Sequence, residues 1–189
     1  MKENNLLNHT YNYRSPAREG VDSIVTVNVL DEIWERDIKY IYIQGKSRTT
    51  YFFAMIDCFT MQVVGKYLGY HCTSDGVKKA VDLAFLDRGI ERISHVRIRS
   101  DNGTQFVNRT VKLYLLSSNI DHERIHSATP KEDAHIESFN SILEKEVIRR
   151  FEFSSLENAE TTIYRFIEFY NNERLHSAID YKAPREVCI

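Results

Sequence analysis

Three strand-like segments follow one another between residues 38 and 70, and this succession limits the folds open to the chain more than any other feature. The segments IKYIYI, TYFFAMI and MQVVGKYLGY are rich in Ile, Val, Tyr and Phe, which favour extended structure. Turn-like residues separate them at positions 45–47 and 58–60. Because connections this short join neighbouring antiparallel strands, we expect an antiparallel meander of three strands.

Helical patterns begin after residue 72. Thr73 or Ser74 is a suitable N-cap, and Gly89 a suitable end, for a helix whose apolar residues recur at helical spacing. A second helix is predicted over residues 106–119. The side chains expected to face inward from this second helix are Val111, Leu113 and Leu116.

Strand-like segments at 92–100 and 120–126 flank the second helix, and two further helices are predicted over about 133–150 and 156–171. The order is therefore three strands, helix, strand, helix, strand and two helices. It belongs to the α/β class and predicts a mixed five-stranded sheet, three antiparallel strands then two parallel ones, flanked by helices on both faces. The arrangement resembles the ribonuclease-H-like fold, which does not by itself establish a function.

The composition is that of a single globular domain. The 189 residues include 42% apolar and 28% charged side chains, so a complete hydrophobic core is expected. No apolar run approaches the roughly 18 residues that cross a membrane, and the N-terminus lacks the apolar segment of a signal peptide. Cys58, Cys72 and Cys188 are odd in number and scattered, which indicates free thiols in a reducing cytoplasm.

Three carboxylates stand where the predicted elements could bring them together. Asp37 is where the first strand is expected to begin, Asp101 follows the fourth strand, and Glu137 is near the start of the long helix, with 35 residues between the last two. The first and fourth strands can be neighbours, and a helix crossing their ends would place Glu137 beside both Asp residues. Each acid alone has an ordinary explanation as a turn or helix-terminus residue, so the prediction depends on the set and its order.

Three converging carboxylates repel one another unless divalent cations lie between them. Their oxygens suit Mg²⁺ or Mn²⁺, and two such ions about 4 Å apart can stabilise the attacking and the leaving oxygen of a phosphoryl displacement. The formal net charge of −2 argues weakly against a nucleic-acid ligand, but two bound divalent ions would change it to +2. The acidic balance is therefore compatible with a DNA substrate.

Five stretches between Trp34 and Glu186 carry a family resemblance: WERDIKY, YFFAMIDCFT with the following VVG, SDNGTQF, ATPKEDAHIESFNSILEKEV and YNNERLHSAIDYKAPREV. Together they resemble the integrase catalytic core shared by retroviral integrases and the Asp-Asp-Glu transposases of bacterial insertion sequences. The resemblance implies a polynucleotidyl transferase that carries out metal-dependent DNA cleavage and strand transfer during transposition. It also implies that Asp37, Asp101 and Glu137 are the catalytic residues and hold two Mg²⁺ or Mn²⁺ ions.

The resemblance divides the chain into an N-terminal arm, residues 1–33, and a catalytic core with a C-terminal helical tail, residues 34–189. The arm is expected to be the end of a helical DNA-binding segment, so that the part which recognises the element ends would be missing. Expected partners are DNA, as element ends and target, and a second copy in a homodimer, in the bacterial cytosol and without a membrane. The tail from Tyr170 to Ala178 is expected to pack back on the core in preference to contacting DNA directly. Asp57 is expected to be structural, or to support the metal ligands from behind, and not to be a fourth ligand.

Residues near the three acids are the candidate DNA contacts. Those expected to lie near phosphates are Lys131, Lys145, Arg149 and Arg150, together with the amide Asn102. Arg97 and Arg99 share one face of the strand that leads to Asp101 and are further candidates. His135 and His176 lack zinc-finger spacing and are expected to be structural.

Two acids depart from the family pattern. Asp133 replaces the amide usually found four residues before Glu137, and Glu144 replaces the lysine often found seven residues after it. Asp133 would either cap the helix, as acids at helix N-termini do, or repel the phosphates of DNA. Two alternatives to an active transposase core stay open. One is a catalytically weakened remnant that binds DNA or other subunits, and the other is a ribonuclease-H-type hydrolase.

Overall fold

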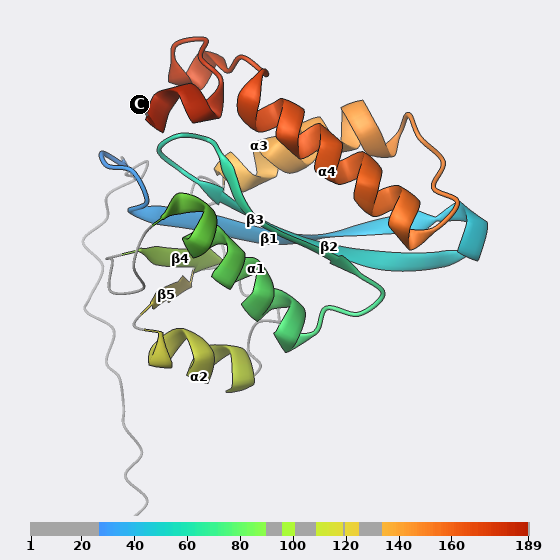
Figure 1. Cartoon of the computed structure of the whole chain (residues 1–189), viewed down its shortest axis with the longest axis horizontal. Coiled ribbons are helices and arrows are strands. Elements are labelled where there is room, and N and C mark those ends of the chain that lie inside the picture. The colour runs from blue at the N-terminus through green and yellow to red at the C-terminus, as the bar shows by residue number, and fades with distance from the viewer. Residues whose placement is uncertain (1–26, 90–95, 101–108, 119, 125–133, 189) are drawn as a thin grey trace, which may run out of the picture.

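A five-stranded mixed sheet forms the centre of the computed structural model, which describes residues 27–89, 96–100, 109–118, 120–124 and 134–188. Its strands are β1 (Ile33–Ile43), β2 (Arg48–Asp57), β3 (Val63–Gly69), β4 (Arg97–Ser100) and β5 (Asp121–Arg124). The strand order is β3-β2-β1-β4-β5, with β1, β2 and β3 antiparallel and with β4 and β5 parallel to β1 (Figure 1). The predicted α/β fold with its ribonuclease-H-like sheet is confirmed.

β1 is the longest strand and begins earlier than predicted. It starts at Ile33, so Asp37 lies inside the strand and not at its beginning. The four residues before Asp37 are buried and pair in parallel with β4. Two of them, Glu35 and Arg36, are polar, and for this reason the sequence pattern did not reveal the first part of the strand.

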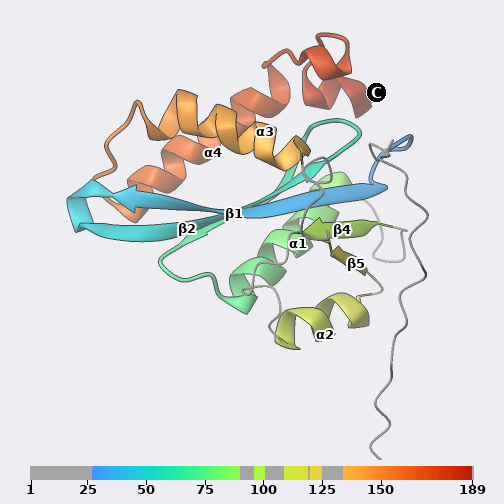
Figure 2. The same cartoon turned by 180° about the vertical axis from the view of Figure 1, so that it is seen from behind.

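Helices cover both faces of the sheet (Figures 1 and 2). Their bounds are α1 (Ser74–Arg88), α2 (Arg109–Ser117), α3 (Ala134–Leu143) and α4 (Leu156–Asn172). α1 and α2 lie on one face, and α3 and α4 lie on the other. α3 continues into a π-helical turn over Glu144–Ile148, so the predicted long helix is present with an irregular second half. Among the residues that the structure describes, no helix has the length and apolar character needed to cross a bilayer.

β2 separates two hydrophobic cores, because successive side chains of a strand point to opposite faces. Phe52, Ala54 and Ile56 pack with α3 and α4, whereas Phe53 and Met55 pack with α1 and α2. All five are buried. Burial on both faces explains why this segment reads as a nearly continuous apolar run and not as an alternation.

Both predicted ends of α1 are confirmed. The Thr73 hydroxyl accepts a hydrogen bond from the Gly76 N–H at the start of the helix. Gly89 ends the helix with a φ of 62°, in the left-handed region that glycine adopts without steric cost.

The inward face of α2 differs from the prediction. Val111 and Leu115 are buried, whereas Leu113 and Leu116 are 56% and 75% exposed. Residues four positions apart share a helical face, so the buried stripe runs through Val111 and Leu115. The prediction that Leu113 and Leu116 face inward is therefore wrong.

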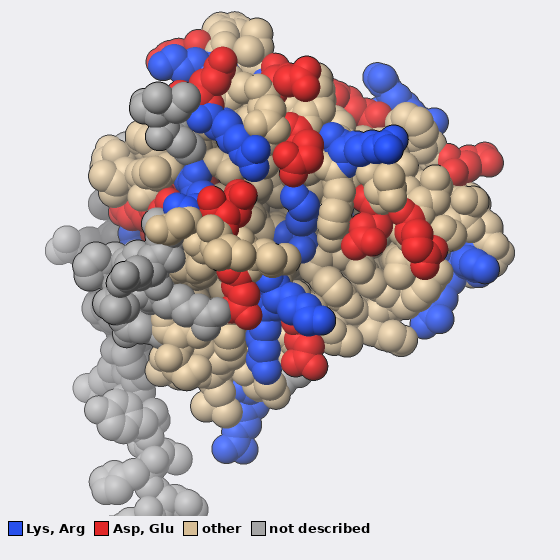
Figure 3. Space-filling view, in the orientation of Figure 1, with Lys and Arg blue, Asp and Glu red and all other residues tan. Residues whose placement is uncertain are grey.

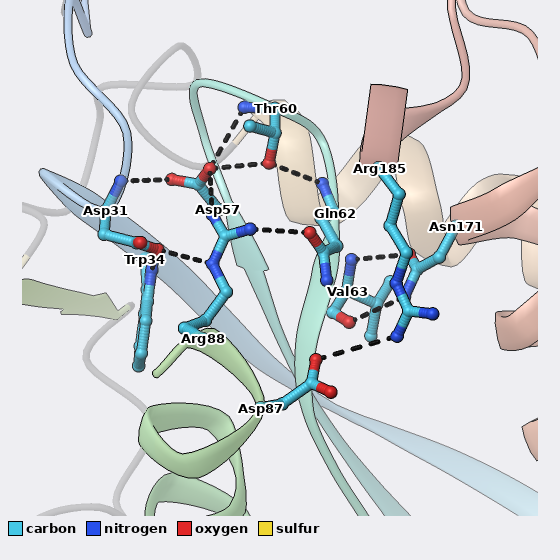
Figure 4. Close-up of polar contacts among 10 residues, drawn as sticks. All are labelled: Asp31, Trp34, Asp57, Thr60, Gln62, Val63, Asp87, Arg88, Asn171 and Arg185. Carbon is cyan, nitrogen blue, oxygen red and sulfur yellow. Dashed lines mark hydrogen bonds and ion pairs between the residues drawn. The ribbon is translucent and has the colours of Figure 1, made fainter. Parts of the chain in front are cut away.

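A buried arginine side chain ties α1 to the end of the sheet where β1 begins and β2 ends (Figure 4). The Arg88 guanidinium donates hydrogen bonds to Asp31 at 2.8 Å, to Gln62 at 2.6 Å and to Asp57 at 3.0 Å. Burial raises the pKa of Asp57, while its hydrogen bonds from Thr60 and the positive charge of Arg88 oppose the increase. These contacts give Asp57 the structural role expected of it.

The segment after α4 folds back on the core (Figure 4). Asn171, near the end of α4, donates to the carbonyl of Val63 and accepts from its N–H, both at 2.9 Å. Arg185, in a 3₁₀ turn over Pro184–Cys188, lies 3.7 Å from the Asp87 carboxylate of α1. The expected packing of the tail on the core is therefore present.

Replacing Asn171 by Ala should lower the free energy of unfolding by about 2–4 kcal/mol, because two buried backbone groups of Val63 would lose their partners. Urea denaturation followed by circular dichroism measures the loss. The adjacent Asn172 is exposed and supplies the control, since Asn172→Ala should change the same quantity by less than about 0.5 kcal/mol. Equal losses in the two variants would contradict the role assigned to Asn171.

His176 should make the stability depend on pH. Its ring centroid lies 4.5 Å from that of Tyr170, and its Nε2 is buried without a hydrogen-bond partner among the described residues. Burial and the nearby Arg174 lower the pKa of His176, against an opposing effect of Glu146. The unfolded chain therefore binds this proton more tightly than the folded chain. The contribution of His176 to the free energy of unfolding is fully present above its ordinary pKa of 6.5. It is lost as the pH falls through the lower pKa of the folded state.

We expect the free energy of unfolding to fall less steeply in His176→Gln than in wild type between about pH 7 and about pH 5, because the variant lacks this proton-binding group. Urea denaturation at a series of pH values measures both slopes. The difference between the two proteins isolates His176 from the other histidines. Identical slopes would show that His176 does not contribute.

Candidate active site

The middle of β1 and the first turns of α3 meet at Asp37. Asp37 is half-buried, and Asn140 Nδ2 donates a hydrogen bond to its Oδ2 at 2.7 Å. Its Oδ1 accepts the N–H of Ile38 at 2.7 Å. Asn140 lies about one helical turn after Glu137. Asp37 is thus attached to the helix that carries Glu137.

Glu35 makes a second attachment between the same two elements. Its carboxylate is buried, and Oε2 accepts the backbone N–H groups of His135 and Ile136, both at 3.0 Å. Oε1 lies 2.8 Å from His135 Nδ1. The first N–H groups of a helix have no partner within the helix and carry partial positive charge, so an acid at this place is stabilising. Glu35 therefore caps α3 from the neighbouring strand.

The two attachments lie on either side of Glu137. Glu35 and Asp37 are two residues apart on β1 and so face the same side of the sheet. Their partners on α3 precede and follow Glu137, which is itself exposed. The sequence analysis missed Glu35, although its place two residues before Asp37 on a strand was an available signal. The structure thus brings the strand of one predicted catalytic acid against the helix of another.

The third predicted acid, Asp101, lies outside the described residues. β4 ends one residue earlier, at Ser100, which is opposite Arg36 in the parallel ladder. The chain thus leaves β4 beside the residue that precedes Asp37. This register is what a convergence of Asp37 and Asp101 requires, and the place of the Asp101 carboxylate stays a prediction.

The donor atoms of this site suit a hard divalent cation. Asp37 and Glu137 offer carboxylate oxygens, and the Oδ1 of Asn140 is buried without a hydrogen-bond partner in the described part of the chain. An unpaired amide oxygen on the residue that binds Asp37 is a further donor of the kind that hard cations accept. The oxygen donors present are therefore of the kind that the predicted Mg²⁺ or Mn²⁺ ions require.

The predicted DNA contacts that follow α3 are at the surface. Lys145, Arg149 and Arg150, within and just after the π-helical turn, are exposed. All three are open to solvent, and Arg149 also pairs with Glu144. The other two predicted contacts, Lys131 and Asn102, lie outside the described residues.

The arginines of β4 are engaged within the protein. Arg99 is 4% exposed and donates a hydrogen bond to Glu123 of β5 at 3.0 Å. Arg97 pairs with Glu32 at 3.0 Å. The expectation that Arg99 offers a surface contact to phosphate is therefore wrong. Figure 3 shows acidic and basic side chains interspersed, without one continuous basic area, on the face that α1 and α4 cover.

Glu144, one of the two departures from the family pattern, is paired with bases. Its carboxylate lies 3.1 Å from Lys39 Nζ on β1 and 3.2 Å from Arg149 Nε. Partial burial opposes the ionisation of Glu144, but the hydrogen bonds and charges of Lys39 and Arg149 outweigh it and lower the pKa of Glu144. The negative charge is thus compensated within the protein. The other departure, Asp133, lies outside the described residues, and both explanations of it stay open.

Comparisons with known sequences show which proteins this chain resembles. Two integrase core domain profiles match the chain, over residues 30–130 and 118–184. The transposase for insertion sequence element IS904 of Lactococcus lactis is 27% identical over 187 residues, which cover 93% of this chain and 72% of the relative. An uncharacterized 31.7 kDa protein of insertion element IS407 from Burkholderia multivorans is 26% identical over 177 residues, which cover 92% of this chain but 62% of the relative.

Several solved structures of similar fold are retroviral integrases. The HTLV-2 integrase catalytic core domain in complex with magnesium matches with a TM-score of 0.63 at 19% identity, covering 83% of this chain and 95% of that chain. A chain of the simian T-cell lymphotropic virus intasome, in complex with PP2A regulatory subunit B56 gamma, matches with a TM-score of 0.67 at 16% identity. This match covers 83% of the present chain and 54% of the intasome chain. At these identities the likeness concerns the fold.

In Glu35→Ala, the amide protons of His135 and Ile136 should exchange with solvent at least about tenfold faster than in wild type. Loss of their buried acceptor costs about 1–3 kcal/mol and opens the start of α3. Hydrogen exchange followed by NMR measures both amides. Glu137→Ala removes an exposed acid from the same helix and should leave these amides unchanged. Unaltered exchange in Glu35→Ala would show that the start of α3 does not depend on Glu35.

Proposed function

The chain belongs to the integrase core domain family, and from this premise we propose that it is the catalytic core of a DNA transposase. The proposed reaction is metal-dependent cleavage at the ends of a mobile element followed by strand transfer into target DNA. The double attachment of α3 to β1 carries the proposal, because it keeps Glu137 on a helix fastened to the strand of Asp37. The register of β1 against β4 supports Asp101 as the third acid.

Asp37, Asp101 and Glu137 are the proposed ligands of two Mg²⁺ or Mn²⁺ ions. The HTLV-2 integrase core, a relative by fold, was solved in complex with magnesium. The chemistry that such ions supply when bound is activation of an attacking oxygen and stabilisation of a leaving oxygen. Asn140 orients Asp37 through its hydrogen bond, and Glu35 orients Glu137 by holding the start of α3.

Two displacements at phosphorus make up the proposed reaction. In the first, a water oxygen bonds to phosphorus at the element end, and the 3′ oxygen leaves and takes up a proton as a 3′ hydroxyl. In the second, this hydroxyl loses its proton, bonds to a phosphorus of the target and displaces the target's own 3′ oxygen. Each step exchanges one P–O bond for another, so neither a Ser nor a Tyr nucleophile is required.

The charges after α3 favour an enzyme over a weakened remnant. Glu144 is neutralised by Lys39 and Arg149, so it does not present an uncompensated negative charge to DNA. The proposed phosphate contacts are the exposed Lys145, Arg149 and Arg150, together with Lys131 and with Asn102, which follows Asp101 in the sequence. Such contacts to the backbone provide affinity and position, without reading the sequence of the DNA.

The proposed assembly is a homodimer that acts on paired DNA ends in the bacterial cytosol. The HTLV-2 integrase catalytic core was solved in dimeric and trimeric forms. Sequence relatives such as the IS904 transposase belong to insertion elements of bacteria. In a homodimer each core would supply one active site, and closed two-fold dimers are the commonest homo-oligomers.

Joining of a branched DNA substrate, which reverses strand transfer, tests the proposal. We expect the reaction to require added Mg²⁺ or Mn²⁺. Asp37→Asn and Glu137→Gln should each reduce the rate at least about 10³-fold, because each removes charge that stabilises the transition state. Asp75→Asn changes an exposed acid at the start of α1 and should retain the activity of wild type.

The other outcomes separate the alternatives. Cleavage of an RNA–DNA hybrid without strand transfer would favour a ribonuclease-H-type hydrolase. DNA binding without joining would favour a remnant that no longer catalyses. Full activity of Asp37→Asn would contradict the assigned site.

A further inference from the structure

Three potential metal ligands of different chemistry converge next to the candidate active site, and we propose that they form a second cation site suited to Zn²⁺. A carboxylate oxygen of Glu35, the Sγ of Cys58 and a ring nitrogen of His135 all lie within 4.8 Å of one another. These residues belong to β1, to the position after β2 and to the start of α3. The site shares no ligand with the proposed Mg²⁺ site.

The sequence conceals this cluster because its members are far apart. Glu35 and Cys58 are separated by 22 residues, and Cys58 and His135 by 76, unlike the short ligand spacings of zinc fingers. The antiparallel ladder brings the first two together, since the Cys58 N–H donates to the Ile33 carbonyl at 3.0 Å. The cap of α3 then places His135 on Glu35.

Glu35 is already oriented as a ligand. Two backbone N–H groups hold its Oε2, while its Oε1 faces His135 Nδ1 at 2.8 Å. Hydrogen bonds of this kind fix the geometry of ligating carboxylates in metal sites. Glu35 and Cys58 are 1% and 4% exposed, so these two ligands would be shielded from solvent.

A cavity of about 350 Å³ adjoins the cluster and has Cys58 and His135 in its wall. The C-terminal segment contributes Ile179 and Lys182 to the same wall. Zinc sites with three protein ligands keep a fourth position for water or another small ligand. The cavity offers the space for that ligand.

The donor set selects the cation. Sulfur, nitrogen and oxygen donors together match Zn²⁺, whereas Mg²⁺ prefers oxygen ligands alone. Burial and the adjacent Glu35 carboxylate raise the pKa of the Cys58 thiol, so in the metal-free protein the thiol keeps its proton. Cation binding would release the thiol proton to solvent, the His135 ring would ligate through Nδ1 with its proton on Nε2, and coordination would replace the contacts of both groups with Glu35. The bound ion would connect β1, the end of β2 and the start of α3.

Zn²⁺ affinity and Co²⁺ absorption, both measured in excess Mg²⁺, test the site. Wild type should bind one Zn²⁺ at least about 100-fold more tightly than Cys58→Ala. Loss of a group that only hydrogen-bonds to a metal ligand already costs about 10–100-fold in metal affinity, and loss of a direct ligand should cost more. Co²⁺ should produce a thiolate-to-metal charge-transfer absorption in wild type that Cys58→Ala lacks. Cys72→Ala removes a half-buried cysteine outside the cluster and should behave as wild type.

His135→Asn is a second variant, which tests the site even if circular dichroism shows that Cys58→Ala does not fold. It should also lose Zn²⁺ affinity. Asp37→Asn should bind Zn²⁺ as wild type does, so failure of this site and failure of the proposed transposase activity are distinguishable. Equal Zn²⁺ affinity in wild type, Cys58→Ala and His135→Asn would overturn the proposal, as would the absence of Zn²⁺ binding by wild type at micromolar concentrations.

Discussion

The attachment of α3 to β1 is the interaction on which the candidate active site depends. A buried carboxylate is costly unless its oxygens are hydrogen-bonded, and the first N–H groups of a helix lack partners within it. Glu35 and the start of α3 satisfy both requirements at once. With the second contact, from Asn140 to Asp37, this cap determines how the helix lies on the strand and therefore where Glu137 is presented.

The remainder of the fold keeps β1 in a defined position. β2 pairs with it along ten residues and is buried on both faces, while β4 pairs with it where the chain approaches Asp101. Polar contacts tie the outer elements to this centre: Arg88 joins α1 to the start of β1 and the end of β2, and Asn171 joins α4 to β3. The hydrophobic cores thus supply stability, and a few buried polar groups fix the relative placement of the elements.

Local patterns predicted much of this structure, and tertiary contacts account for the rest. The capping of α1 by Thr73 and the antiparallel succession of β1, β2 and β3 follow from residue types within short windows. The early start of β1 did not, because Glu35 looks like a surface residue until α3 packs on it. The pairing of Arg99 with Glu123 requires the β4–β5 register, which spacing along the chain does not reveal. The three acids were recognisable as a set, whereas the residue that orients one of them was not.

We propose that packing of α3 on β1 brings Asp37, Glu137 and Asp101 together as one metal-binding site. A crystal structure of Mn²⁺-soaked protein tests it most directly, because anomalous scattering locates the ions. We expect Mn²⁺ to be coordinated by carboxylate oxygens of these three acids, with Glu35 still bound to the N–H groups of His135 and Ile136. Mn²⁺ bound elsewhere, or a Glu137 carboxylate directed away from Asp37 in the presence of the ion, would contradict it.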